Sequence, residues 1–281
     1  MAETLLQSAA AIWRQASADH PPFATVLMFS GGDDSLTALY AAQALGIPID
    51  FLMHVDTGTG IPETTRYVRS LAAALDLPYI EESAGRKFEA YVLRKGFFGR
   101  GHRAHAFAYH LLKNQQFTTG LSKRIRQRKH HRTILLLNGA RRQESARRSK
   151  TMPEPVRVFR SNVWVNLIHE WSKVECMDFL HQEKARRNPV TQFLHRSGEC
   201  MCGTMQSHEE RREAAYWFPA WGDWLLSLEA HVKALGFPWG WGDEIPPLGK
   251  GGKGDPFTAH WGGTIYPHFL ISRFVHPALR A

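Results

Sequence analysis

The segment that says most about the fold of this chain is a short loop, Ser30–Ser35 (SGGDDS), between an apolar run and a segment with helical spacing. The apolar run, Thr25–Phe29, is bounded by Pro-Pro and Gly-Gly, which predicts a buried strand. Ser35–Leu45 predicts a helix that ends at Gly46 and Pro48. A helix N-terminus attracts anions through its unpaired N–H groups and its dipole. The arrangement therefore predicts an α/β fold whose first strand ends at a phosphate-binding loop.

Predicted strands and helices continue to alternate after this loop. They are a strand at Ile49–Val55, a helix from Pro62 to about Leu75, a weaker strand at Pro78–Glu82 and a strand at Thr133–Asn138. Such alternation forms right-handed βαβ units, and so a parallel sheet sandwiched by helices. Farther on we expect short edge strands at Val156–Phe159 and Val163–Val165, and helices opened by the capping boxes Ser172/Glu175 (toward Glu183) and Ser207/Glu210 (to about Leu228).

The chain divides into three expected parts. These are an amphipathic helix in 1–20, an α/β domain in 21–235, and an irregular extension rich in Gly, Pro and Trp in 236–281. No apolar run approaches the roughly 20 residues that span a bilayer. The N-terminus also lacks the basic start and apolar block of a secretion signal. We therefore expect a cytoplasmic protein that does not bind membranes.

Every residue of the loop is a candidate for binding a nucleotide: Ser30, Gly31, Gly32, Asp33, Asp34 and Ser35. The glycines let consecutive N–H groups face one phosphate, and the serines add hydroxyl donors. A carboxylate beside a phosphate requires a cation between them, so we assign Asp34 a Mg²⁺ ion and a catalytic role. The spacing and the lysine of a Walker A loop are absent. A tight turn that binds nothing is the alternative interpretation.

Two more polar segments follow predicted strands, and the carboxyl ends of parallel strands line one crevice. After the second strand the candidates are His54, Asp56, Thr57 and Gly58, with backbone groups of 53–55 placed to recognise adenine. After the fourth strand they are Gly139, Arg141, Arg142, Glu144 and Arg147, with Arg141 and Arg142 as catalytic candidates. Arginines there can hold phosphate or sulfate. The alternatives are a Gly-rich connector and a solvated charged loop.

Three motifs in this order resemble the PAPS-reductase-like (phosphoadenosine phosphosulfate reductase) branch of the PP-loop ATP pyrophosphatase superfamily. They are SGGxDS at 30–35, DTGTGIPET at 56–64 and G-x-R-R-x-E-S-x-R at 139–147. The segment 166–171 is similar to the N-P-I…W stretch of that branch, with Leu167 in place of proline, and 101–103 with 112–113 resembles its substrate loop. The resemblance covers about residues 20 to 205. It implies a Rossmann-like, adenine-nucleotide α-hydrolase fold, ATP as cofactor, and a loop that grips leaving pyrophosphate.

The resemblance admits two chemistries. The intact loop with Asp34 favours cleavage of ATP between its α and β phosphates, giving AMP and pyrophosphate while activating an acceptor. Such relatives act in sulfur transfer or nucleic-acid modification, including DNA phosphorothioation. The first alternative is a thiol-dependent PAPS or APS reductase with Cys200 as nucleophile, although Gly198–Thr204 (GECMCGT) departs from the C-terminal Glu-Cys-Gly-x-His of true reductases. The second alternative is a nucleotide-gated nucleic-acid-binding protein.

The cysteines leave three interpretations open. Cys200 and Cys202 are a redox or sulfur-carrying pair, or metal ligands together with His195 and His208, or small buried residues. Cys176 is expected in the core. Three cysteines do not supply the ligands of a four-cysteine iron–sulfur cluster, so none is expected.

The formal net charge of +9 favours anionic partners. Seven Lys and Arg residues and no acidic residue lie between 113 and 132, and five more with one Glu lie between 141 and 150. These two basic loops are candidates for binding DNA or RNA. The first is alternatively a mobile lid over ATP or a loop that keeps the protein soluble. A sulfur donor or a partner protein of a modification system is also expected.

Overall fold

The computed structural model describes residues 2–144 and 154–245, and those up to Glu244 belong to one compact unit. Its helices are α1 (Ala2–Asp19), α2 (Asp33–Ala44), α3 (Pro62–Ala74), α4 (Lys87–Lys95), α5 (His102–Tyr109), the π-helix η1 (His110–Asn114), α6 (Gln115–Gly120), the π-helix η2 (Leu121–Ile125), the 3₁₀ turn η3 (Arg142–Glu144), α8 (Lys173–Gln182), α9 (Pro189–Leu194), α10 (His208–Trp217) and α11 (Pro219–Ala234). Its strands are β1 (Ala24–Met28), β2 (Phe51–Asp56), β3 (Tyr79–Ser83), β4 (Ile134–Asn138), β5 (Val156–Phe159) and β6 (Asn162–Asn166).

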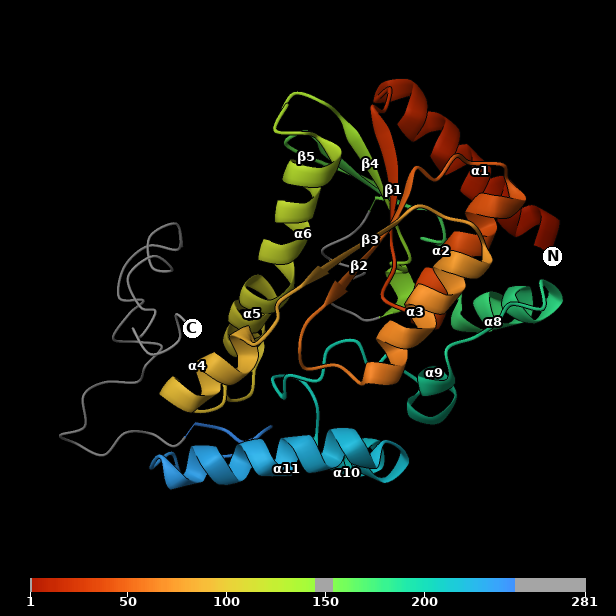
Figure 1. The fold of residues 1–281 in the computed structure, drawn as a ribbon. Coiled ribbons are helices and arrows are strands. Elements are labelled where there is room, and N and C mark those ends of the chain that lie inside the picture. Colours follow the sequence, from red (N-terminus) through yellow and green to blue (C-terminus); the bar gives the residue numbers. More distant parts are fainter. Residues whose placement is uncertain (1, 145–153, 246–281) are drawn as a thin grey trace. The chain divides into compact units, whose positions relative to one another are not determined.

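The strands form one sheet in the order β3-β2-β1-β4-β6-β5, in which β5 alone runs antiparallel to its neighbour. Apolar side chains on one face of the sheet pack against α1, α2, α3 and α8 (Figure 1). Those on the other face pack against α6 and η2. The strand order reverses between β1 and β4, and open α/β sheets bind ligands at such a switch point. The predicted fold class, a mostly parallel sheet sandwiched by helices, is confirmed.

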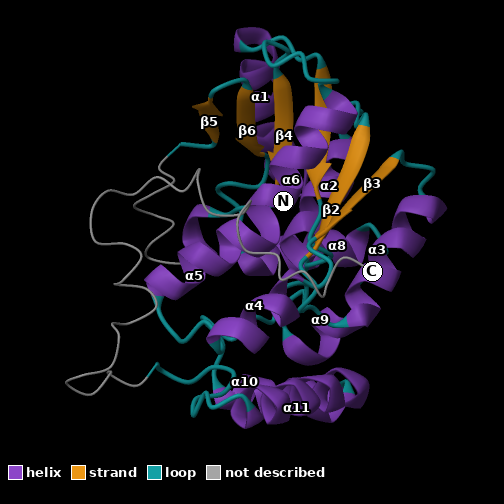
Figure 2. Ribbon diagram, turned by 60° about the vertical axis from the view of Figure 1, so that its left-hand side comes forward, coloured by secondary structure: helices purple, strands orange, loops and turns teal. Residues whose placement is uncertain are grey.

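Most predicted elements are found within one or two residues of their expected bounds, including both capping boxes. The prediction of β6 as an edge strand is wrong, because it lies between β4 and β5 (Figure 2). The helix expected from Ser207 to about Leu228 is two helices, because Pro219 lacks an N–H group and cannot continue α10. Helices α4, α5 and α9 were not predicted.

The basic run 113–132 is a helix for most of its length, which corrects its interpretation as a loop. Residues 102–125 are helical without a break, with α and π segments in succession. Arg124 pairs with Glu82, and Arg126 is buried and donates to the Ser161 and Arg132 carbonyls. The run is therefore part of the wall that covers one face of the sheet, not a lid that is free along its whole length.

The predicted extension begins on the α/β unit itself. The indole N–H of Trp241 donates to the Met201 carbonyl at 2.8 Å, and that of Trp239 donates to the Phe97 carbonyl at 2.9 Å. Trp241 is completely buried. Both tryptophans therefore pack against the protein. Residues 246–281 of the extension lie outside the described residues. Along the described ranges, no helix has the length and apolar character of a membrane span.

Candidate active site

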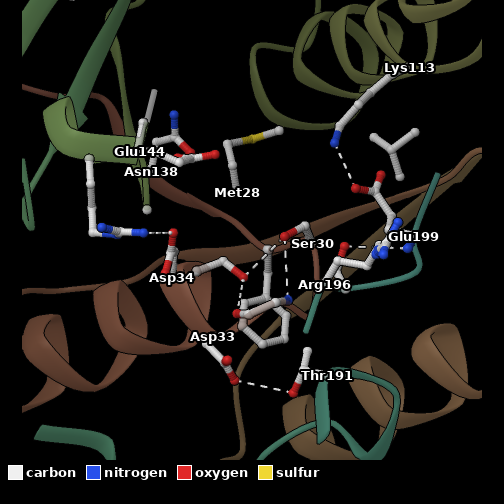
Figure 3. Close-up of a pocket in the computed structure, with 18 of the residues that line it drawn as sticks. Met28, Ser30, Asp33, Asp34, Lys113, Asn138, Glu144, Thr191, Arg196 and Glu199 are labelled. Carbon is white, nitrogen blue, oxygen red and sulfur yellow. Dashed lines mark hydrogen bonds and ion pairs between the residues drawn. The ribbon is translucent and has the colours of Figure 1, made fainter. Parts of the chain in front are cut away.

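A cavity of about 640 Å³ lies at the carboxyl ends of the central strands, a size typical of small-molecule sites (Figure 3). The predicted candidates that line it are Ser30, Gly32, Asp33, Asp34, Ser35, Gly139, Arg141, Glu144 and His195. Residues that line it but were not predicted as site residues include Met28, Met53, Val55, Lys113, Phe117, Asn138, Trp164, Lys173, Thr191, Arg196 and Glu199. The cavity thus joins the ends of β1, β2 and β4 to side chains from the helical wall and from the segment after α9.

The loop at Ser30–Ser35, called the phosphate loop below, leads directly into α2. Gly31 has a positive φ of 76°, a conformation that glycine adopts without strain. The Ser35 hydroxyl donates to the Gly32 carbonyl at 2.9 Å and lies 3.2 Å from the Ser30 hydroxyl. No described side chain caps the N-terminus of α2. Its first residues line the cavity, so its unpaired N–H groups are available to an anion bound there.

Gly139, the first residue after β4, permits a close approach between two parts of the site. A Cβ atom at this position would collide with the carbonyl oxygen of Asp34. We expect Gly139→Ala to destabilise the protein by about 1–3 kcal/mol, the usual cost of overpacking. Nucleotide affinity should also fall, because the first turn of α2 must shift. Urea unfolding and nucleotide titration check both effects.

Gly46→Ala is the matched control for this substitution. Gly46 also lies in a tight connection, with φ of 62°, but nothing lies within 4 Å of an added Cβ. It should therefore lower stability through backbone strain alone and leave the affinity of the intact site unchanged. Equal nucleotide affinity of Gly139→Ala and wild type would contradict the steric argument.

Asp33 is buried and anchors the phosphate loop to the segment around α9. Its carboxylate accepts from Arg187 at 3.0 and 3.1 Å, from Lys173 at 3.2 Å and from Thr191 at 3.2 Å. Burial alone would raise the pKa of Asp33, but the bond to Arg187 and the charges of Lys173 and Arg187 outweigh it and lower the pKa. The carboxylate is thus held charged as part of an ion network.

Asp34 lies beside two cations at the same end of the cavity. Its oxygens are 3.0 Å from an Arg141 guanidinium nitrogen and 3.2 Å from the Lys173 ammonium. The Arg141 side chain is 7% exposed, and its Nε atom is buried without a protein hydrogen-bond partner. Burial would lower the pKa of Arg141, but Asp34 outweighs it and raises the pKa. Two fixed cations therefore lie beside the N-terminus of α2.

The donor set fits Mg²⁺ as an ion that arrives with a nucleotide. Among the described residues, no group of three or more His, Cys, Asp or Glu side chains is placed to hold a metal. Mg²⁺ commonly takes one or two carboxylates and completes its shell with phosphate oxygens and water. Asp34 is partly exposed, whereas the Asp33 carboxylate is buried in its ion network. Asp34 is thus the carboxylate better placed for this purpose.

A second charged pair lies at the other end of the cavity. The Lys113 ammonium, from η1, is 2.7 Å from one oxygen of Glu199. Burial would lower the pKa of Lys113, but the charge of Glu199 and its hydrogen bond outweigh it and raise the pKa. The other carboxylate oxygen of Glu199 is buried and has no protein partner. Figure 3 shows this pair separated from Asp34 by Met28 and Ser30.

Cys200 and Cys202 follow Glu199 and interact with each other. A hydrogen bond between the two thiols raises the pKa of Cys200 and lowers that of Cys202 to about 7. The Cys202 sulfur also lies 3.3 Å from the Thr204 hydroxyl. Cys202 is buried, Cys200 is half-buried, and Cys176 lies in the core as expected. Thiolate character therefore lies on the less accessible member of the pair.

The ligands of the metal interpretation, Cys200, Cys202, His195 and His208, do not form one group in the described part of the chain. The described residues contain no group of suitable side chains at this position. His208 instead pairs with Asp243 at 3.0 Å, and His195 lies on the lining of the cavity. The four side chains thus have separate environments, which sequence spacing alone did not show.

Several predicted site residues lie behind the cavity instead of on its lining. His54 is buried against the Phe29 carbonyl at 2.8 Å. Asp56 accepts from the Gly58 N–H at 2.9 Å and from the Ser83 hydroxyl at 3.0 Å. The Thr57 hydroxyl donates to the Glu199 carbonyl at 2.7 Å. Asp56 and Thr57 thus shape the loop after β2, and Thr57 holds the backbone of Glu199.

The predicted arginines after β4 lie in different surroundings. Arg142 pairs with Glu170 at 3.0 Å, is 46% exposed and does not line the cavity. Arg141 does line it. Arg147 lies outside the described residues. The geometry thus assigns the two adjacent arginines different surroundings.

Comparison with known proteins gives a family and a set of similar folds. The model of the family described as "Phosphoadenosine phosphosulfate reductase domain" matches residues 24–214, more than half of the chain. Phosphoadenylyl-sulfate (PAPS) reductase from Candida auris, a phosphate complex, is 14% identical over 66% of this chain and 83% of that chain, with a TM-score of 0.48.

Two further solved structures are similar. FMN adenylyltransferase from Candida glabrata, with FAD and inorganic pyrophosphate, is 10% identical over 73% of this chain and 63% of that chain, with a TM-score of 0.49. NH3-dependent NAD synthetase from Campylobacter jejuni, with nitrate, is 15% identical over 83% of this chain and 91% of that chain, with a TM-score of 0.44. No curated protein matches the chain significantly.

Proposed function

The chain belongs to the phosphoadenosine phosphosulfate reductase domain family, and we propose that it binds ATP in the cavity and cleaves it between the α and β phosphates. The main support for this proposal is the set of groups at the end of the cavity around the phosphate loop. There the uncapped N-terminus of α2, Arg141 and Lys173 lie together. Asp33 and Asp34 are paired with three cations, Arg141, Lys173 and Arg187, so positive charge remains beside the helix N-terminus, and together these features suit a polyphosphate.

In the proposed reaction, an acceptor atom attacks the α phosphorus of ATP. The bond from that phosphorus to the bridging oxygen breaks, and pyrophosphate leaves with the electron pair while AMP joins the acceptor. Negative charge grows on the leaving pyrophosphate, where the N–H groups of α2, Arg141 and Lys173 stabilise it. When bound, Mg²⁺ supplies further charge neutralisation beside Asp34.

The acceptor is proposed to belong to sulfur transfer or nucleic-acid modification. Support for sulfur chemistry comes from the interacting pair Cys200 and Cys202, which directly follows the cavity residue Glu199. Support for a nucleic acid comes from the exposed cations Arg128 and Lys129, which can contact phosphates. These cations precede β4, so they lie at the opposite end of the sheet from the cavity. A bound nucleic acid would therefore contact the protein at more than one place if it also reached the site.

The geometry favours ATP cleavage over a reductase that uses Cys200. A thiolate is the nucleophile in that chemistry, whereas the pKa of Cys200 is raised, first by its bond to Cys202 and then by burial. Cys200 also does not line the cavity. Release of sulfite from PAPS in the presence of a thioredoxin-like donor would establish the reductase instead.

Product analysis with α-labelled ATP and Mg²⁺ tests the proposal. With no acceptor added, water takes the place of the attacking atom, and we expect labelled AMP and an equal amount of pyrophosphate. Asp34→Ala should lower the rate about 100-fold, because the carboxylate that orients Arg141, Lys173 and the cation is lost. Asp178→Ala, an exposed aspartate of α8, is the control and should keep the wild-type rate. Labelled ADP as the product, or an unchanged rate in Asp34→Ala, would refute the proposal.

A further inference from the structure

The end of the cavity at Lys113 and Glu199, called the Lys–Glu end below, contains an unsatisfied buried carboxylate oxygen. Glu199 is 6% exposed and lines the cavity. One of its oxygens accepts from the Lys113 ammonium at 2.7 Å, and the other has no partner in the protein. Buried polar atoms are almost always hydrogen-bonded, and an unpaired carboxylate oxygen is costly. The position therefore suits a hydrogen-bond donor on a ligand.

The backbone of Glu199 is fixed by contacts with two other residues. Its carbonyl oxygen accepts from the Thr57 hydroxyl at 2.7 Å. Gly60 packs so closely that a Cβ atom there would collide with the same carbonyl. The carboxylate is thus presented by a backbone that two other residues fix, as a binding site requires.

The Lys–Glu end is not a second phosphate site. Its two charges cancel, and the carboxylate would repel a phosphate. The cations that attract phosphate, Arg141 and Lys173, lie beside Asp34 at the opposite end, beyond Met28 and Ser30 (Figure 3). A nucleotide with its phosphates on the phosphate loop therefore presents an uncharged part to the Lys–Glu end.

The pair offers two kinds of hydrogen bond side by side. The free oxygen of Glu199 only accepts, and the ammonium of Lys113 only donates. Adenine matches this pattern, because its 6-amino group donates beside a ring nitrogen that accepts. Guanine carries the acceptor O6 where adenine carries the 6-amino group, so in the same orientation it would place an acceptor against the Glu199 oxygen. Met28, Met53, Val55 and Phe117 also line the cavity and provide apolar contacts for the faces of a ring.

We propose that Glu199 and Lys113 recognise the adenine base, with the 6-amino group donating to Glu199 and Lys113 donating to the adjacent ring nitrogen. This inference rests on the proposed binding of ATP. It assigns base recognition to two side chains instead of to the backbone of 53–55. It also gives the Glu199 oxygen its missing partner.

Equilibrium binding of ATP and ITP tests this assignment without any need for turnover. ITP carries an oxygen acceptor where ATP carries the 6-amino group. We expect the wild type to prefer ATP by roughly 5- to 150-fold, the range for one well-placed polar contact. In Glu199→Gln, the side-chain oxygen can stay on Lys113 while the amide turns its NH₂ group to the ligand. ATP should then bind more weakly and ITP more tightly than in the wild type.

Glu81→Gln is the matched control, since Glu81 pairs with the exposed Arg69 and does not line the cavity. It should keep the wild-type preference. Thermal unfolding of each variant shows whether the fold is intact, and the wild-type comparison of ATP with ITP stands even if Glu199→Gln does not fold. Equal affinities of the wild type for the two nucleotides, or an equal loss of both in Glu199→Gln, would overturn the inference. Failure to bind any triphosphate would refute the proposed function as well, which distinguishes the two.

Discussion

Arg141→Ala is expected to lower kcat/KM for ATP cleavage by about 10²–10³, the usual loss when one preorganised donor to a developing negative charge is removed. Arg141 is buried at the cavity lining, 3.0 Å from Asp34, and its Nε atom has no partner in the protein. The guanidinium is therefore in place before a phosphate arrives. Initial rates over a range of ATP concentrations measure the effect.

Arg142→Ala is the matched control for this prediction. It removes the same side chain one residue later, but Arg142 is half exposed and pairs with Glu170 outside the cavity. An exposed ion pair contributes about 0–1 kcal/mol, so its loss should change stability and rate only slightly. Equal losses of activity in the two variants would contradict the assignment of Arg141, and not Arg142, to the phosphates.

Arg141→Lys adds a second control, because it keeps the positive charge but not the planar, bidentate donor group. We expect it to recover part of the rate lost in Arg141→Ala. Full recovery would mean that charge alone matters at this position, and that the orientation set by Asp34 does not.

The phosphate loop could be predicted from sequence because its geometry is local. A buried strand, two glycines and the start of a helix are adjacent in the chain, and the fold of these residues follows from their own properties. The same holds for the capping boxes at Ser172 and Ser207, where one turn of helix contains both partners.

The rest of the site could not be predicted, since it depends on contacts between distant segments. Lys173 occupies the first turn of α8 and reaches Asp33 and Asp34. Arg187 reaches Asp33 from the segment before α9. Nothing in the residues around either cation differs from an ordinary exposed helix or loop.

Two further cases show where local patterns fail. Lys113 begins a basic run that indicates a loop for nucleic acid, yet it lies in a π-helix and pairs with Glu199 inside the cavity. Arg141 and Arg142 are adjacent in one motif, yet the Arg141 side chain pairs with Asp34 and the Arg142 side chain pairs with Glu170. Glu199 appeared in the sequence as a neighbour of Cys200, and the burial that makes it a candidate for ligand binding is a property of the fold.

Asp33→Asn is expected to lower the free energy of unfolding by about 3 kcal/mol at pH 7. Removing one partner of a buried ion pair costs about 3–5 kcal/mol, and partial exposure of Arg187 places the effect at the lower end of that range. The Asp33 carboxylate is 6% exposed and accepts from Arg187, Lys173 and Thr191. Asparagine keeps the shape but loses the charge. Urea unfolding measures the difference, with Asp178→Asn on the surface of α8 as the control.

The pH dependence of this difference tests its electrostatic origin. The pKa of Asp33 is lowered in the folded state, because Arg187 and Lys173 together outweigh the opposing effect of burial. The carboxylate therefore contributes stability that is fully present above its unfolded pKa of about 3.9. That contribution is lost as the pH falls below this value and through the lower folded pKa. The difference in the free energy of unfolding between wild type and Asp33→Asn should thus be constant from pH 7 to about pH 5 and disappear below about pH 4. A difference that persisted in acid would mean that Asp33 acts through packing or neutral hydrogen bonds, and the ion network would not be what anchors the phosphate loop to α9.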